Sequence, residues 1–309
     1  MRQSTRMSAI GRCRRRPEQR ARGLLAALAM FAGASCAESV EPVATLEMRI
    51  ARDTAPQGSV IDTALSLTVL PAFEPSDHDY RVFVHFLDVD GNLLWTDDHD
   101  PPTATSSWRP GQTLSYERRV PIPEQSYLGR ATVAVGLYSA SRGDRLPLDG
   151  HDLGQRSYRA ATLTIEAATE RNALTYLNGW YRTESGSVAG RGGLHWRWTS
   201  ESAGLSFLNP YSDVVLQLLL DGRPDLVPGG RQELDMVLNG EPVRRIVLDS
   251  LERQFVEVPL ASAQLGGDRT VRIDLQVRQT FVPSSAPGSG SVDGRRLGVR
   301  VFQAFVDVR

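Results

Sequence analysis

The sequence predicts an all-β protein made of two β-sandwich domains, and three observations carry that prediction. Apolar and polar residues alternate with a period of two over many short segments, as in half-buried strands. Turn-forming residues separate these segments at short intervals, and no segment has a helical period. A chain of 309 residues with 41% hydrophobic content also suits two domains better than one. We expect an immunoglobulin-like sandwich over residues 42–167 and a jelly-roll-like sandwich over residues 176–309.

Residues 1–36 predict an export signal rather than part of a domain. The first 22 residues hold eight arginines and one acidic residue, and an uncharged run follows over residues 23–35. This run is too short to span a bilayer as a helix and has the length of a signal-peptide core. The leader carries a formal charge of +7 and the rest of the chain −8. That balance argues against nucleic acid as a partner.

Cys36 predicts the kind of export signal. It follows three small residues at positions 33–35, a pattern that resembles a bacterial lipobox, in which the cysteine thiol is the point of lipid attachment. The other cysteine, Cys13, lies inside the leader, so Cys36 has no disulfide partner in the exported chain. We therefore expect lipidation at Cys36 and a membrane anchor. The alternative is ordinary cleavage near Ala34 or Ala37.

The first domain is organised around a central strand at residues 79–87. Both of its faces carry bulky side chains, which is typical of a strand in the middle of a sheet. Asp90 and Gly91 then predict a tight hairpin turn into a return strand at residues 93–95. The remaining strands of this domain are predicted at residues 43–51, 59–70, 113–120, 131–139 and 160–165.

The second domain follows a join at residues 167–176, which carry no strong pattern. A long irregular loop at residues 283–296 precedes its last strand. Its predicted strands lie at residues 214–220, 234–238, 245–248, 255–260, 271–277 and from 297 to the end.

The last strand changes phase in its middle. Val299 and Val301 share one face, whereas the apolar set from Phe302 onward continues on the other. Because a period-two ladder changes phase only with an extra residue, we predict a β-bulge near Val301-Phe302. The bulge should turn Gln303 and Asp307 toward solvent. The alternative is a strand covered on both faces.

An acidic cluster at residues 97–100 is the candidate for metal or acid–base chemistry. Asp98 and Asp100 are the possible metal ligands, with His99 between them. The alternative is that these side chains cap the turn that Pro101-Pro102 enforces. No cofactor is predicted.

Aromatic residues gather near the start of the second domain: Trp180, Tyr181, Trp196 and Trp198. Such rings can stack on sugars, but more often they fill the core of a sandwich. Asp293 and Arg295, in the long loop, form a pair that could recognise sugar hydroxyls in a cleft or simply fix the loop.

Short motifs in both domains carry a family resemblance. They are residues 84–88 with Gly91, 98–102, 108–111, 136–138 and 145–148 in the first domain, and 179–180, 196, 281–283 and 291–298 in the second. On these motifs, residues 75–165 resemble a β-sandwich module at the extracytoplasmic end of bacterial membrane glycosyltransferases of the protein-mannosyltransferase type. The second domain resembles another accessory module of cell-envelope glycosyltransferases, similar to carbohydrate-binding jelly rolls. The resemblance implies a fold and brings no catalytic residues.

These patterns together predict a non-catalytic cell-envelope lipoprotein that binds or organises envelope glycan. We expect it to be exported to the periplasm or cell surface, with envelope polysaccharide or another envelope protein as its partner. A structural or assembly lipoprotein that contacts another envelope protein is one alternative, and a glycan-active enzyme is another. An enzyme of that kind needs two carboxylates about 5 to 9.5 Å apart in a cleft, a glycan binder needs an exposed aromatic platform, and a scaffold needs neither.

Overall fold

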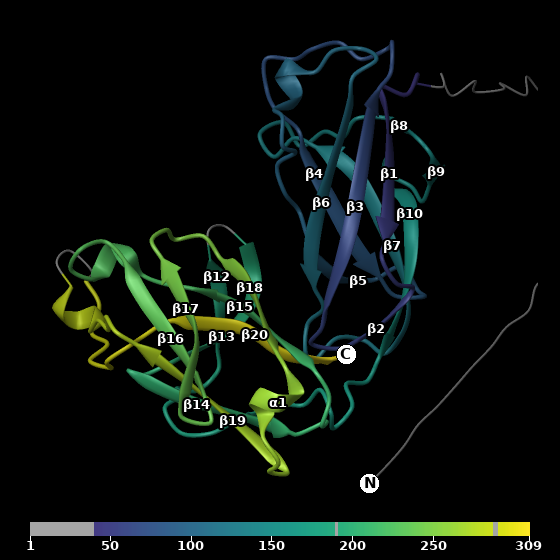
Figure 1. Cartoon of the computed structure of the whole chain (residues 1–309). Helices are drawn as coiled ribbons and strands as arrows, with labels where there is room; N and C mark the ends of the chain where they lie inside the picture. Colours follow the sequence, from purple (N-terminus) through teal and green to yellow (C-terminus); the bar gives the residue numbers. More distant parts are fainter. Residues whose placement is uncertain (1–39, 189–190, 287–289) are drawn as a thin grey trace, which may run out of the picture. The chain divides into compact units, whose positions relative to one another are not determined.

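The computed structural model describes residues 40–188, 191–286 and 290–309, and their secondary structure is almost entirely β (Figure 1). The strands form four sheets that pack as two sandwiches, which confirms the predicted fold class. Within the described residues, no helix has the length and apolar character needed to cross a membrane.

The first sandwich pairs a four-stranded sheet with a six-stranded one. The first sheet has the order β6-β3-β1-β8, and the second has the order β2-β10-β7-β4-β5, with β9 on β10. Strands β1 and β8 run parallel, as do β2 and β10, and the other neighbours run antiparallel. The strands of this sandwich are β1 (Ala44–Ile50), β2 (Thr54–Pro56), β3 (Val60–Val69), β4 (Arg81–Leu87), β5 (Leu93–Thr96), β6 (Thr113–Pro121), β7 (Gly129–Tyr138), β8 (Leu148–Asp149), β9 (His151–Asp152) and β10 (Tyr158–Glu166).

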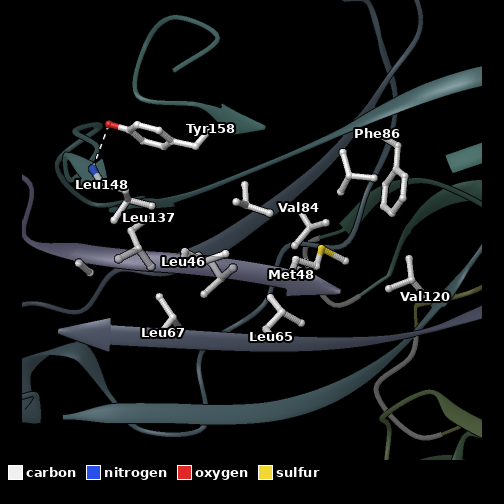
Figure 2. Packing of buried hydrophobic residues seen from close by; sticks show 14 of the residues in the cluster. Leu46, Met48, Leu65, Leu67, Val84, Phe86, Val120, Leu137, Leu148 and Tyr158 are labelled. Atoms are coloured by element: carbon white, nitrogen blue, oxygen red, sulfur yellow. Dashed lines mark hydrogen bonds between the residues drawn. The ribbon is translucent and has the colours of Figure 1, made fainter. Parts of the chain in front are cut away.

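The core of the first sandwich forms where the alternating side chains of both sheets meet. Figure 2 shows Leu46 and Leu65 from one sheet packed with Val84 and Leu137 from the other. In β3 every second residue is buried, as its sequence pattern predicts. The Tyr158 hydroxyl, at the edge of this core, accepts a hydrogen bond from the backbone N–H of Leu148 at 2.9 Å (Figure 2).

The second sandwich consists of two five-stranded sheets. One has the order β11-β14-β19-β16-β17 and the other the order β12-β13-β20-β15-β18. Leucine, isoleucine and valine side chains of both sheets fill the space between them. The strands are β11 (Thr175–Tyr176), β12 (Glu184–Val188), β13 (Arg191–Trp198), β14 (Ser202–Leu208), β15 (Val214–Asp221), β16 (Gln232–Leu238), β17 (Glu241–Leu248), β18 (Gln254–Leu260), β19 (Thr270–Val277) and β20 (Arg300–Val308).

Some short elements are absent from the sequence prediction. Strands β2, β8, β9, β11, β12 and β14 were not predicted. Four of them are only two or three residues long, and β12 and β14 both contain serine and glycine. Single helical turns also occur between strands: η1 (Thr105–Ser107), η2 (Pro224–Leu226), α1 (Ser262–Leu265) and η3 (Pro283–Ser285).

The predicted bulge in the last strand is confirmed, but part of its expected consequence is wrong. Leu219 of β15 pairs with Gln303 and Leu220 pairs with Val301, so Phe302 is the extra residue. Gln303 does not face solvent. It is only 7% exposed, and its amide donates to the carbonyls of Gly58 and Ser59. Tertiary contacts cover this face of the strand, which a period-two pattern cannot reveal.

Candidate functional site

A cleft of about 460 Å³ opens in the second sandwich and is the candidate site. It forms where the start of β12, the end of β13, the turn η2 and the segments 281–283 and 291–297 come together. Its lining divides into an apolar floor and a charged rim. The floor consists of Trp198, Leu226, Phe281 and Leu297, and the charged rim consists of Glu184, Arg223, Asp225, Asp293 and Arg295.

The floor is a small hydrophobic cluster separate from the main core. The Trp198 and Phe281 rings meet edge to face, with centroids 5.6 Å apart at an angle of 75°. Phe281 and Leu297 exchange two backbone hydrogen bonds, of 3.0 and 2.8 Å, which close the base of the loop between them. Trp198, Phe281 and Leu297 are all buried and pack in one cluster, and each of them lines the cleft.

Arg295 organises one side of the rim. Its guanidinium donates to Asp293 Oδ2 at 2.7 Å and to Glu184 Oε1 at 2.7 Å, so it links the loop to β12. The hydrogen bonds from Arg295 lower the pKa of Asp293, and those bonds raise the pKa of Arg295 in return. The guanidinium also lies 5.1 Å from the centre of the Tyr181 ring, whose hydroxyl donates to the Arg296 carbonyl.

Arg223 and Asp225 form the other side of the rim. The Arg223 guanidinium donates two parallel hydrogen bonds, of 2.8 and 2.7 Å, to the Asp225 carboxylate, in the bidentate geometry that arginine favours. This pairing lowers the pKa of Asp225. The backbone N–H of Arg223 donates a hydrogen bond to the side-chain oxygen of Gln232, which is fully buried. This bond holds the backbone of Arg223 in place.

A buried ion pair supports the floor. Asp221 has no exposed surface, and Arg300 binds both of its oxygens at 2.7 Å. The Arg300 guanidinium lies 5.3 Å from the Trp198 ring centre and 5.6 Å from that of Trp196. Burial raises the pKa of Asp221, although Arg300 acts in the opposite direction. The pair therefore packs against Trp198, and neither of its residues lines the cleft.

The structure brings three of the predicted site residues into the cleft lining: Trp198, Asp293 and Arg295. Tyr181 packs against the floor cluster beside them. Trp196 also contacts that cluster, but its ring turns toward Phe302, with centroids 6.0 Å apart.

Trp180 lies elsewhere. It packs against the main core of the sandwich, and its indole N–H donates to the Gly204 carbonyl at 2.7 Å. The tryptophans therefore do not form one shared exposed platform, because Trp180 packs on the main core whereas Trp198 is buried in the separate cluster at the cleft.

The acidic cluster of the first sandwich is engaged in contacts within the protein. Asp100 accepts a hydrogen bond from Arg81 at 2.8 Å, and Asp98 lies 3.6 Å from His85 and accepts the Val84 N–H. Asp97 is buried and paired with Arg118. No group of three or more metal-binding side chains occurs in the part of the chain that the structure describes. Cys36, the predicted lipidation site, lies outside the described residues.

Sequence reasoning missed several lining residues, above all Glu184, Arg223, Asp225 and Phe281. One signal was available, since Arg223 and Asp225 have the same two-residue separation as Asp293 and Arg295. That separation also occurs at Arg272 and Asp274, which form a similar fork outside the cleft. The spacing therefore predicts ion pairs but does not show which of them meet at a site.

Comparison with known proteins gives structural likenesses only. No protein-family model matches the chain, and no curated protein matches it. Among solved structures, the C-terminal domain of wzt is similar at 12% identity and a TM-score of 0.30, covering 42% of this chain and 77% of that one.

Two carbohydrate-binding modules are also similar. The CBM36-1 domain of a multidomain xylanase from the hindgut metagenome of Trinervitermes trinervoides has 9% identity and a TM-score of 0.26, covering 44% of this chain and 94% of that one. The CBM51 of GH95 from Clostridium perfringens, solved with methyl-galactose, has 13% identity and a TM-score of 0.24, covering 43% of this chain and 99% of that one. At such low scores these likenesses do not identify a ligand, and the chain is assigned to no family.

Proposed function

We propose that the second sandwich binds a glycan in the cleft and performs no catalysis. The observation that carries this proposal is the combination of an apolar floor with a rim of paired carboxylates and guanidiniums. A sugar ring has C–H surface that packs on ring edges and aliphatic carbon. Its hydroxyls both donate to carboxylates and accept from guanidinium N–H groups. Most ligand sites in proteins share this plan of an apolar lining with a few fixed polar groups.

The rim favours binding over catalysis. A glycosidase needs one carboxylic acid that is protonated near neutral pH, with a raised pKa. The pKa values of Asp225 and Asp293 are instead lowered by their arginine partners. Glu184 is also held, at 2.7 Å from Arg295. The lowered pKa values make the carboxylates of Asp225 and Asp293 good hydrogen-bond acceptors and poor proton donors.

The cellular setting is part of the same proposal. We propose that the protein is exported, that Cys36 carries a lipid anchor, and that the glycan belongs to the cell envelope. The basic leader, its uncharged run and the small residues before Cys36 support this. Under this proposal the second sandwich would hold or organise envelope polysaccharide near the membrane.

A binding screen with a matched pair of variants tests the glycan site. Purified full-length protein would be titrated with envelope polysaccharide and with a panel of oligosaccharides by calorimetry. Arg295→Gln should weaken binding at least about tenfold, because it removes charge-assisted hydrogen bonds at the rim. Arg272→Gln disrupts a similar fork outside the cleft and should leave binding unchanged. If no glycan binds the wild-type protein, the glycan proposal fails and the assembly role is favoured.

A further inference from the structure

The described lining residues of the cleft carry more negative than positive formal charge. Three carboxylates and two guanidiniums lie among its described lining residues, a net formal charge of −1. The ion pair of Asp221 and Arg300 behind the floor adds no net charge. A ligand that enters this cleft therefore meets a slightly negative surface.

Both guanidiniums of the rim are already committed to carboxylates. Arg223 uses two nitrogens on Asp225, and Arg295 is shared between Asp293 and Glu184. Arginine recognises a carboxylate or a sulfate through the same fork of N–H groups. An acidic ligand would meet a guanidinium whose charge a carboxylate of the protein already neutralises, and it would have to bind beside that carboxylate or displace it.

A neutral sugar neither meets charge repulsion from these carboxylates nor has to displace one of them. The paired carboxylates keep lone pairs that can accept hydrogen bonds from hydroxyls, and each guanidinium has more N–H groups than its partner uses. Hydroxyl groups can join this network without breaking an ion pair. An amino sugar is also compatible with the cleft, because its positive charge complements the excess carboxylate.

We propose that the cleft takes an uncharged sugar and discriminates against sugars that carry a carboxylate or a sulfate. This inference rests on the proposed glycan-binding function and specifies the class of glycan. Selection comes from the carboxylates that occupy the arginine forks, so Asp225 acts as a specificity determinant.

Matched sugar pairs test the selectivity directly. Glucose, galactose and mannose would each be compared with the corresponding uronic acid, by calorimetry or by ligand-observed NMR, at neutral pH and low ionic strength. For the stereochemistry that binds, the uronic acid should bind at least about tenfold more weakly than the neutral sugar, a difference of about 1.4 kcal/mol. Equal or tighter binding of the uronic acid would overturn the inference.

A variant that frees one arginine should largely remove the preference. Asp225→Asn preserves the shape of the side chain, removes its charge and releases the Arg223 fork. We expect uronic acid affinity to rise about tenfold while neutral sugar affinity falls or stays constant. Asp274→Asn is the matched control, because Asp274 forms a similar fork with Arg272 outside the cleft. It should leave both affinities unchanged.

The outcomes separate this inference from the proposed function. If neither neutral sugars nor uronic acids bind, and longer glycans do not bind either, the glycan function itself fails. If sugars bind at the cleft but Asp225→Asn leaves the uronic acid affinity unchanged, the function stands and the role given to Asp225 is wrong.

Discussion

Replacing one partner of the buried ion pair behind the cleft should destabilise the protein strongly. Asp221 is fully buried and Arg300 is 12% exposed, and two hydrogen bonds of 2.7 Å join them. Asp221→Leu removes the carboxylate and leaves a guanidinium buried without its counter-ion. Changes of this kind cost about 3–5 kcal/mol. We expect a value near 3 kcal/mol, because Trp196, Trp198 and Phe302 surround the Arg300 guanidinium at 5.3 to 5.6 Å and offset part of the loss.

A double-mutant cycle separates this charge effect from packing. Arg300→Met alone should also be costly, because it leaves Asp221 buried without its cation. The combined variant, Asp221→Leu with Arg300→Met, should lie within about 1 kcal/mol of wild type, since apolar replacement of a whole buried pair is often neutral. Urea unfolding, followed by tryptophan fluorescence, gives the free energy of unfolding for each protein. The exposed pair of Arg272 and Asp274 is the reference, and Asp274→Asn should cost no more than about 1 kcal/mol.

Two results would refute this reasoning. A cost below about 1 kcal/mol for Asp221→Leu would mean that Arg300 reaches water and that the pair is not a buried one. A double variant as unstable as the sum of the two single variants would mean that packing, and not charge, decides the stability of this region.

Three further predictions concern a glycine, the rim and the anchor. Gly179 has a φ of 86°, and a Cβ there would lie 1.9 Å from the Ser202 carbonyl oxygen, so Gly179→Ala should lower the midpoint of urea unfolding clearly. The pKa values of Asp225 and Asp293 are lowered in the folded protein from 3.8, so their stabilisation is complete above that pH and is lost as the pH falls through the folded-state values. Glycan affinity measured between pH 7 and pH 3 should accordingly stay level and drop only at the acid end; a loss already near pH 6 would contradict this. Cys36→Ser should move the protein from the membrane fraction to the soluble fraction, and unchanged membrane association would contradict the lipid anchor.

The alternation of apolar residues determined most of the fold. In strands such as β3 and β16 one face must be buried and the other not, so the pattern alone identifies the strand and its inward side. The bulge at Phe302 was predictable for the same reason, because a change of phase needs an extra residue. Short strands such as β11 contain too few residues for a pattern.

Which residues make up the site was decided by the tertiary structure. The sequence singled out Trp198, Asp293 and Arg295, but it could not show that Glu184 and Asp225, which lie far away along the chain, share their cleft. Nor could it separate Trp198 from Trp180, although both belong to the same aromatic group. Local spacing determines which charges can pair. Only the folding of distant strands and loops onto one another decides which pairs surround a cavity, because side chains meet there through contacts that no local period encodes.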